Sequence, residues 1–176
     1  QYGSGNAGST NVLRTLGKGR ALITFLGDAL KGMIPVLIIK FAIGPAVPGL
    51  NSELLQLVLG FAVVIGHDFP FFLHFKGGKG IATSAAVMMG FDWRMGLCCL
   101  VIFVVVVAAT RYVSLASTLL SAALIVEILI FYPGRWDLFV LILLYAGFAI
   151  YRHRANIKRL MAGTESKLGQ KVEVKK

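Results

Sequence analysis

The sequence predicts an all-helical integral membrane protein, and two observations support this fold class. The first is composition: 57% of the 176 residues are hydrophobic and only 15% are charged, which gives a mean hydropathy of +0.78. A water-soluble domain rarely has so few charges to cover so many apolar side chains. The second is that the apolar residues form long blocks of the length that crosses a bilayer. We expect one transmembrane domain over residues 1–176, which ends in a basic cytoplasmic tail over residues 152–176.

Five apolar blocks stand out along the chain, and the third is ambiguous. It contains the polar stretch Asp92-Trp93-Arg94. A full span needs roughly 20 residues, so this block is either one bent helix or two short helices that are broken at the polar stretch. The five blocks are Ala21 to Ile43, Leu54 to Phe75, Ile81 to Thr110, Val113 to Phe131 and Leu138 to Tyr151.

The positions of lysine and arginine decide between these two topologies. Cytoplasmic loops of membrane proteins are enriched in positive residues, so we place the basic tail in the cytoplasm. With a break at Asp92, the loop around Lys76 and Lys79 falls on the same face as the tail, and so does the N-terminal stretch around Arg14. An unbroken third block would put Lys76 and Lys79 outside. The sequence therefore predicts six crossings, of which the one over residues 81–90 is short.

This short crossing has a consequence for the position of the site. As a helix, residues 81–90 would rise about 15 Å, about half the thickness of the bilayer core. A short or broken helix at membrane depth is tolerated where it lines a cavity within the protein. We therefore expect short broken helices around a polar site at the cytoplasmic face.

The net charge of +10 limits the choice of partners. In a soluble protein this charge would suggest nucleic acid. Here much of the excess lies in loops and the tail, which is typical of membrane topology and of attraction to anionic lipid. We expect contact with membrane lipid, no nucleic acid and a monomer. Cys98 and Cys99 have no partners at ligand spacing, so we interpret them as packing residues.

Three polar segments carry the candidate chemistry. The first, Gly3 to Arg14, contains the letters of the G-x-G-x-x-G dinucleotide pattern, but apolar helical blocks follow it where that pattern requires a strand and a βαβ unit. We therefore reject a dinucleotide site. Small residues that expose backbone amides, hydroxyls and side-chain amides, together with Arg14, could bind an anion; a flexible loop explains the same composition.

The second segment, Gly66 to Thr83, contains Lys76-Gly77-Gly78-Lys79-Gly80. Glycines let the backbone turn its amides toward an anion, and lysines supply charge. The stretch resembles a Walker A loop, but Gly80 stands where that loop needs Ser or Thr to hold magnesium, which argues against an NTPase. The alternative is that the two lysines only follow the positive-inside bias.

The third segment, Tyr151 to Leu160, places His153 and Asn156 on one helix face by their i, i+3 spacing. The alternative is a basic helix that leaves the membrane. No acidic residue near His153 in the sequence could orient its ring. The chain also contains no H-x4-D pair, no G-x-S-x-G elbow and no set of residues at metal-ligand spacing. Asp28 and Lys31, three apart in the first block, are interpreted as a structural ion pair.

Taken in order, the three segments resemble the bacterial membrane family of acyl-phosphate-dependent glycerol-3-phosphate acyltransferases. The family motifs are G-S-G-N-x-G-x-T-N-x-x-R, G-H-x-F-P-x-F-x-x-F-K-G-G-K-G-x-A-T and Y-R-H-R-x-N-I-x-R-L-x-x-G-x-E, and the last ends here at Glu165. A shorter stretch, Arg111 to Ser117, matches a fourth family segment. The resemblance implies seven helices, the first of which precedes the Gly3 motif, so six are expected in this sequence.

The resemblance also implies a reaction and a site. The reaction is transfer of a fatty acyl group from acyl phosphate to the 1-hydroxyl of glycerol 3-phosphate, giving lysophosphatidic acid and phosphate, with a substrate phosphate accepting the hydroxyl proton. By matching position, the catalytic residues are Ser4, Arg14, Lys79, His153 and Asn156. The residues expected to bind substrate are Gly5, Asn6, Thr10, Asn11, Lys76, Gly77, Gly78, Gly80 and Ser117.

The residues fit this reaction in their own right. Two phosphorylated substrates must share one site, which demands concentrated positive charge and oriented donors. An acyl phosphate is already activated, so positioning and charge neutralisation could supply most of the rate. We expect no cofactor and no metal, and a multi-pass protein of the bacterial plasma membrane whose site faces the cytoplasm. The alternative function is a transporter or binder of an organic phosphate without chemistry.

Overall fold

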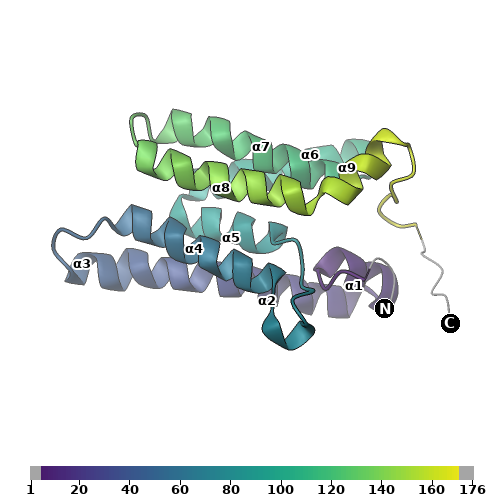
Figure 1. Ribbon diagram of the computed structural model, residues 1–176, viewed down its shortest axis with the longest axis horizontal. Coiled ribbons are helices and arrows are strands. Elements are labelled where there is room, and N and C mark those ends of the chain that lie inside the picture. Colours follow the sequence, from purple (N-terminus) through teal and green to yellow (C-terminus); the bar gives the residue numbers. More distant parts are fainter. Residues whose placement is uncertain (1–4, 171–176) are drawn as a thin grey trace.

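The computed structural model describes residues 5–170, and its regular elements in that range are all helices (Figure 1). Ser4 and the end of the basic tail lie outside the described residues. In chain order, the elements are α1 (Ser9–Leu16), α2 (Lys18–Ile38), the π-helical turn η1 (Ile39–Ile43), α3 (Gly44–Ala46), α4 (Ser52–Asp68), the 3-10 turn η2 (Phe71–Leu73), α5 (Ile81–Phe91), α6 (Trp93–Thr110), α7 (Val113–Phe131), α8 (Trp136–Arg152) and α9 (Arg154–Met161).

Four helical segments of the described chain are long and apolar enough to cross a membrane: Lys18–Ala46, Ser52–Leu73, Trp93–Thr110 and Val113–Phe131. A fifth is the pair α8 and α9, which is bent by 57° at His153. Large apolar side chains such as Ile23, Val105 and Ile130 point outward on these helices and are exposed, as expected where lipid is the solvent. The prediction of an all-helical membrane protein is confirmed.

The third apolar block is broken at the predicted place. α5 ends at Phe91 and α6 begins at Trp93. The carboxylate of Asp92 caps α6, since its Oδ1 accepts a hydrogen bond from the Arg94 amide at 2.9 Å. Gly96 then lets α6 lie directly against α5, because a Cβ at this position would overlap the Met89 backbone. Two helices instead of one bent helix therefore occupy this block.

Short α5 lies inside the bundle, where it packs against α2, α4 and α6. Val87 and Met88 on α5 are fully buried and belong to the main apolar core with Leu57, Leu124 and Tyr145. The Tyr145 hydroxyl donates to the Leu57 carbonyl at 2.9 Å, which satisfies the one polar group of that core side chain. α5 is thus surrounded by protein along most of its length.

The loops and short helices of the chain gather at two opposite ends of the bundle (Figure 1). α1 and α9 lie at one end, which we call the inner end, and the glycine-lysine loop before α5 opens there. α3 and the turn between α7 and α8 lie at the opposite, outer end. The three predicted polar segments therefore meet at one end of the molecule.

Candidate active site

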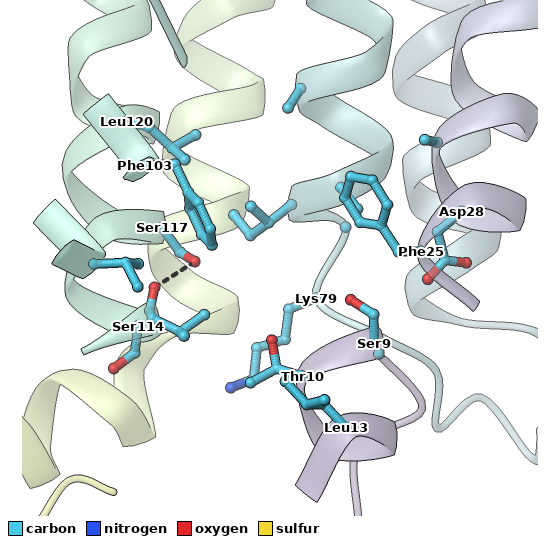
Figure 2. Close-up of a pocket in the computed structure, with 18 of the residues that line it drawn as sticks. Ser9, Thr10, Leu13, Phe25, Asp28, Lys79, Phe103, Ser114, Ser117 and Leu120 are labelled. Carbon is cyan, nitrogen blue, oxygen red and sulfur yellow. Dashed lines mark hydrogen bonds between the residues drawn. The ribbon is translucent and has the colours of Figure 1, made fainter. Parts of the chain in front are cut away.

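A cavity of about 820 Å³ opens at the inner end between α1, α2, α5, α6 and α7. Its two halves differ in chemistry. Figure 2 shows Lys79 and Thr10 at the polar half, and Phe25, Phe103 and Leu120 farther along the cavity. A cavity that joins charged and apolar surfaces suits a ligand with a charged head and an apolar tail.

Lys79 and Asn156 come together from segments that are 77 residues apart. The Lys79 ammonium donates to Oδ1 of Asn156. The other side of the same amide donates to Oε1 of Glu165 at 2.7 Å. Asn156 therefore holds a fixed orientation between a cation and an anion.

Glu165 is the centre of this network. Its carboxylate also accepts hydrogen bonds from the Ser114 hydroxyl at 2.8 Å and from Arg159 Nε at 2.7 Å. Burial raises the pKa of Glu165, but the hydrogen bonds from Asn156, Ser114 and Arg159 outweigh it and hold the pKa below its usual value. The carboxylate stays ionised and ties α7 and α9 to the segment after them.

Arg14 enters the cavity from α1. One terminal nitrogen, Nη2, donates to the Ser166 carbonyl at 3.0 Å. Its Nε is buried and has no hydrogen-bond partner among the described residues. A buried guanidinium N–H without an acceptor is costly, so part of the donor set of Arg14 is available for a ligand.

The charge balance of the cavity favours an anion. Its lining includes the cations Arg14, Lys79 and Arg159 and the carboxylates of Asp28 and Glu165. Asp28 is paired with Lys31 at 2.5 Å and Glu165 with Arg159 at 2.7 Å. Arg14 and Lys79 have no carboxylate within ion-pairing distance in the described part of the chain.

The environment of Lys79 disfavours the charged form of its ammonium group. Its loop lies between the spanning segments. The pKa of the Lys79 ammonium is lowered to about 8, chiefly by burial; Glu165 opposes this shift, and the nearby Arg159, Arg152 and Arg14 add to it. A bound phosphate would supply the negative charge that Lys79 lacks.

His153 lies at the bend between α8 and α9 and is 4% exposed. Its Nδ1 is 2.8 Å from the Ala149 carbonyl oxygen, one turn earlier. A carbonyl only accepts, so the proton lies on Nδ1 and the neutral ring keeps Nε2 as an acceptor. The sequence offered no acid to orient this ring, and the structure supplies a backbone carbonyl for that purpose.

The glycines of the second segment pack the loop against the end of α4. The Gly77 amide donates to the Asp68 carbonyl at 3.1 Å and the Gly78 amide to the His67 carbonyl at 3.2 Å. A Cβ on Gly78 would overlap the His67 ring. The structure gives these two glycines a packing role, and their contact with phosphate stays a prediction.

Gly80 has a different reason to be glycine. Its φ of 71° is a left-handed conformation that other residues rarely adopt. It lines the same cavity as Lys79. Arg152 holds this loop against the end of α4. Its Nη2 donates to the Gly78 carbonyl at 2.7 Å, and its Nε is 3.0 Å from the buried Asp68 carboxylate.

The remaining predicted residues divide into those at the cavity and those away from it. Asn6, Thr10, Asn11 and Ser117 line it. The side-chain amide of Asn11 donates to the Asn6 backbone carbonyl at 2.9 Å, and the Ser117 hydroxyl donates to the Val113 carbonyl at 2.8 Å. Lys76 is exposed and, like Gly5, Gly77 and Gly78, does not line the cavity. Ser4 falls outside the described residues.

Sequence reasoning missed Glu165, Ser114 and Arg159 as members of the site. Glu165 is the last letter of the third motif, so the signal was present, but it lies twelve residues after His153 in the sequence. Arg152 and Asp68 were missed as supports of the Lys79 loop. The described residues contain no group of three or more His, Cys, Asp or Glu side chains arranged to hold a metal.

The fold and this cavity define a class: a multi-pass membrane protein that handles a phosphorylated amphiphile at one end of its bundle. Comparison with known proteins narrows the class. The family model "Glycerol-3-phosphate acyltransferase" matches residues 1–163. A glycerol-3-phosphate acyltransferase of Thermoanaerobacter sp. (strain X514) is 49% identical over 174 residues, covering 99% of this chain and 83% of the relative. That of Clostridioides difficile (strain 630) is 48% identical over 172 residues, covering 97% and 82%.

Solved structures agree. The crystal structure of PlsY (YgiH), an integral membrane glycerol 3-phosphate acyltransferase, in its glycerol 3-phosphate form is 37% identical and aligns with a TM-score of 0.83 over 96% of this chain and 80% of that one. Its lysophosphatidic acid form aligns with a TM-score of 0.82 at 36% identity, over 94% and 81%. The chain belongs to the glycerol-3-phosphate acyltransferase family, which decides for the enzyme over the transporter left open by the sequence.

Proposed function

We propose that this chain transfers an acyl group from an acyl phosphate to the 1-hydroxyl of glycerol 3-phosphate and releases lysophosphatidic acid and phosphate. The observation that carries the proposal is one cavity in which Arg14 and Lys79 lack carboxylate partners among the described residues while the far half is apolar. The cationic half suits the phosphoryl groups of both substrates, and the apolar half suits the acyl chain.

In the reaction, the 1-hydroxyl oxygen attacks the acyl carbonyl carbon. The bond between that carbon and the bridging phosphate oxygen breaks, and the phosphate leaves with the hydroxyl proton. Negative charge gathers on the leaving phosphate, which Arg14 and Lys79 neutralise at fixed positions. Asn156, held between Lys79 and Glu165, keeps the ammonium directed at that charge.

His153 acts here as a positioning group for the acceptor substrate. Its Nδ1–H is engaged by Ala149, so Nε2 accepts a hydrogen bond from a hydroxyl of glycerol 3-phosphate. The proton goes to substrate phosphate because the acyl donor is already activated. Asn6, Thr10, Asn11, Gly80 and Ser117 line the cavity and complete the proposed binding surface. Substrate contacts of Ser4, Gly5, Gly77 and Gly78 stay predictions, and we place the exposed Lys76 outside the binding surface.

We further propose six crossings for this sequence, with buried α5 as the short one, in a single domain that is active as a monomer. The inner end, with Arg14, Lys79 and the basic α9, faces the cytoplasm of a bacterial cell and the membrane is its plasma membrane. The support is the concentration of cations at that end, as the positive-inside rule requires.

The experiment is a reconstitution. Purified protein in nanodiscs receives palmitoyl phosphate and glycerol 3-phosphate, and lysophosphatidic acid and phosphate are measured. Equal amounts of the two products are expected. Binding of glycerol 3-phosphate without any acylated product would overturn the proposal.

The proton transfer is tested with His153→Gln, whose amide still accepts and donates. Measurable turnover is expected between pH 5.5 and 8.5, because the amide can replace the ring's hydrogen bond to the substrate hydroxyl. Complete loss of turnover, with folding and affinity for glycerol 3-phosphate intact, would instead make His153 the general base.

A further inference from the structure

The apolar half of the cavity is a groove with a defined direction. α2 and α5 run from the inner toward the outer end, and α6 runs back. The face of α2 that lines the groove extends from Ala21 to Met33, and that of α5 from Ile81 to Met89. These stretches rise about 18 Å and about 12 Å. The lining of α6 begins at Gly96. The deepest residues from the three helices are therefore Met33, Met89 and Gly96.

The groove closes at these residues because the helices come into direct contact. Met33 packs against Gly90 of α5, with its Cγ 3.4 Å from the position of a Cβ there. The Met89 backbone lies against Gly96 of α6 in the same way. Each methionine thus lies against a glycine of the neighbouring helix, and the lining of the groove ends at this pair.

The middle of the groove has a floor of small side chains on α5. On α5 its floor consists of the small residues Ala82, Ala85 and Ala86. On the lipid side, Leu22 of α2 and Leu100 of α6 line the groove and are 58% and 52% exposed. An acyl chain would therefore lie along the alanines with one flank toward lipid and its end against the two methionines.

We infer that Met33 and Met89 form the end of the acyl-chain groove and set the chain length that the enzyme prefers; this rests on the proposed function. A chain that stops at the methionines fills the groove. A longer chain must turn aside into lipid, and a shorter one leaves the methionines without contacts. Met33 and Met89 act as specificity-determining residues, and the flexible thioether makes the limit soft.

The expected size of the chain-length preference depends on where the acyl chain lies before it binds. Since the free acyl phosphate already lies in lipid, moving its chain into the groove gains packing but little hydrophobic free energy. Dispersion contacts of one or two methylenes then decide the preference. We expect changes of about threefold to tenfold in relative kcat/KM, not of several orders of magnitude.

The test compares acyl phosphates of 12, 14, 16 and 18 carbons in one nanodisc assay. Met89→Ala and Met33→Ala lengthen the groove, so the ratio of kcat/KM for the 18-carbon to the 14-carbon donor should rise at least about threefold. Ala85→Leu fills the floor before the end, so the same ratio should fall by a similar factor. Ile34→Ala is the control, because Ile34 neighbours Met33 but faces lipid at 47% exposure and lies outside the lining.

A ratio measured within one preparation does not depend on the folded fraction, so partial misfolding of a variant leaves the test valid. Shifts in opposite directions for the methionine and alanine variants support the inference. An unchanged ratio in both methionine variants, with normal transfer by the wild type, overturns it. Absence of transfer with every donor would overturn the proposed function instead.

Discussion

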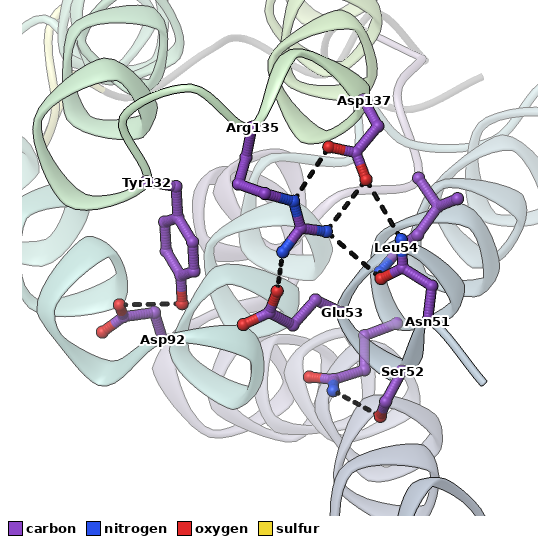
Figure 3. A network of polar contacts seen from close by, with 9 residues as sticks. Asn51, Ser52, Glu53, Leu54, Asp92, Tyr132, Arg135 and Asp137 are labelled. Atoms are coloured by element: carbon purple, nitrogen blue, oxygen red, sulfur yellow. Dashed lines mark hydrogen bonds and ion pairs between the residues drawn. The ribbon is translucent and has the colours of Figure 1, made fainter. Parts of the chain in front are cut away.

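The two ends of the bundle use the same kinds of residue in opposite ways. At the outer end, Arg135 is surrounded by acceptors: Nε and Nη2 donate to the Asp137 carboxylate at 3.0 and 2.8 Å, and Nη1 donates to Glu53 (Figure 3). Nη2 also reaches Oδ1 of Asn51 at 3.2 Å. At the inner end, Arg14 donates to one backbone carbonyl and keeps a buried Nε without a partner among the described residues.

A second pair of outer residues repeats the pattern. Asp92 is paired with Arg94 at 2.6 Å. Its carboxylate also accepts a hydrogen bond from the Tyr132 hydroxyl at 3.1 Å (Figure 3). These contacts join the start of α6 to the end of α7, and those of Arg135 join the starts of α4 and α8. The outer network is complete within the protein, so it serves the fold.

Whether a cluster's charges are matched within the protein distinguishes a structural cluster from a binding cluster better than its residue types do. A buried cation that lacks an anion is unfavourable. Arg14 and Lys79, at one cavity, both lack a carboxylate partner among the described residues. Such a cluster is completed by its ligand. Substitutions at the two ends of the bundle should therefore differ in their effect on activity.

Lys79→Ala should lower kcat at least about a hundredfold, the usual loss when a charge-stabilising donor is removed from a reaction site. Lys76→Ala is the matched control, because it removes an exposed lysine three residues earlier that does not line the cavity. Turnover of acyl phosphate and glycerol 3-phosphate is the measurement, with Tm as a check on folding. Equal, mild effects of the two substitutions would remove Lys79 from the reaction.

Arg14→Lys should keep the net charge and the fold but lower kcat/KM by at least about tenfold. A guanidinium grips a phosphate through two parallel hydrogen bonds, whereas an ammonium offers a single point of charge. Steady-state kinetics with varied glycerol 3-phosphate and acyl phosphate measure the loss. Near-normal constants would reduce Arg14 to a topology charge.

The pH profile should show the unmatched state of Lys79 directly. With a pKa lowered to about 8 in the free enzyme, Lys79 is charged below that pH and loses its charge above it. kcat/KM should therefore fall roughly tenfold per pH unit above about pH 8. Bound phosphate stabilises the ammonium, so the limb in kcat should lie at higher pH. Lys79→Arg provides the control: if its residual activity keeps the same limb, another group titrates.

Much of the fold could be predicted because the signals were local. The apolar blocks and the polar stretch at Asp92 gave the helices and the break between α5 and α6. α1 was not predicted as a helix, and α9 was predicted only as a continuation of the last apolar block, since each has only 8 residues and depends on packing at the inner end. The bend at His153 lies inside a continuous helical pattern, and no Gly or Pro in the sequence there indicates a bend.

The site was less accessible to sequence reasoning because its contacts cross the fold. Lys79 and Asn156 were predicted separately, and only the packing of the bundle places their side chains in contact. Glu165 follows α9 and returns to Ser114, 51 residues earlier. The backbone amides of Gly77 and Gly78 were expected to face an anion, but they are engaged by the end of α4. Composition indicates donors without showing which acceptors already occupy them.

The smallest effect on activity is expected at the outer end. Arg135→Gln removes the centre of the outer network and leaves Glu53 and Asp137 facing each other without a cation, so Tm should fall by a few degrees while kcat/KM stays within about twofold. Because the network is partly exposed, the difference in Tm should shrink at high salt. Lys158→Gln, an exposed cation of α9, is the control and should leave Tm unchanged. A loss of activity in Arg135→Gln that exceeds the loss of folded protein would show that the outer network does more than hold the helices together.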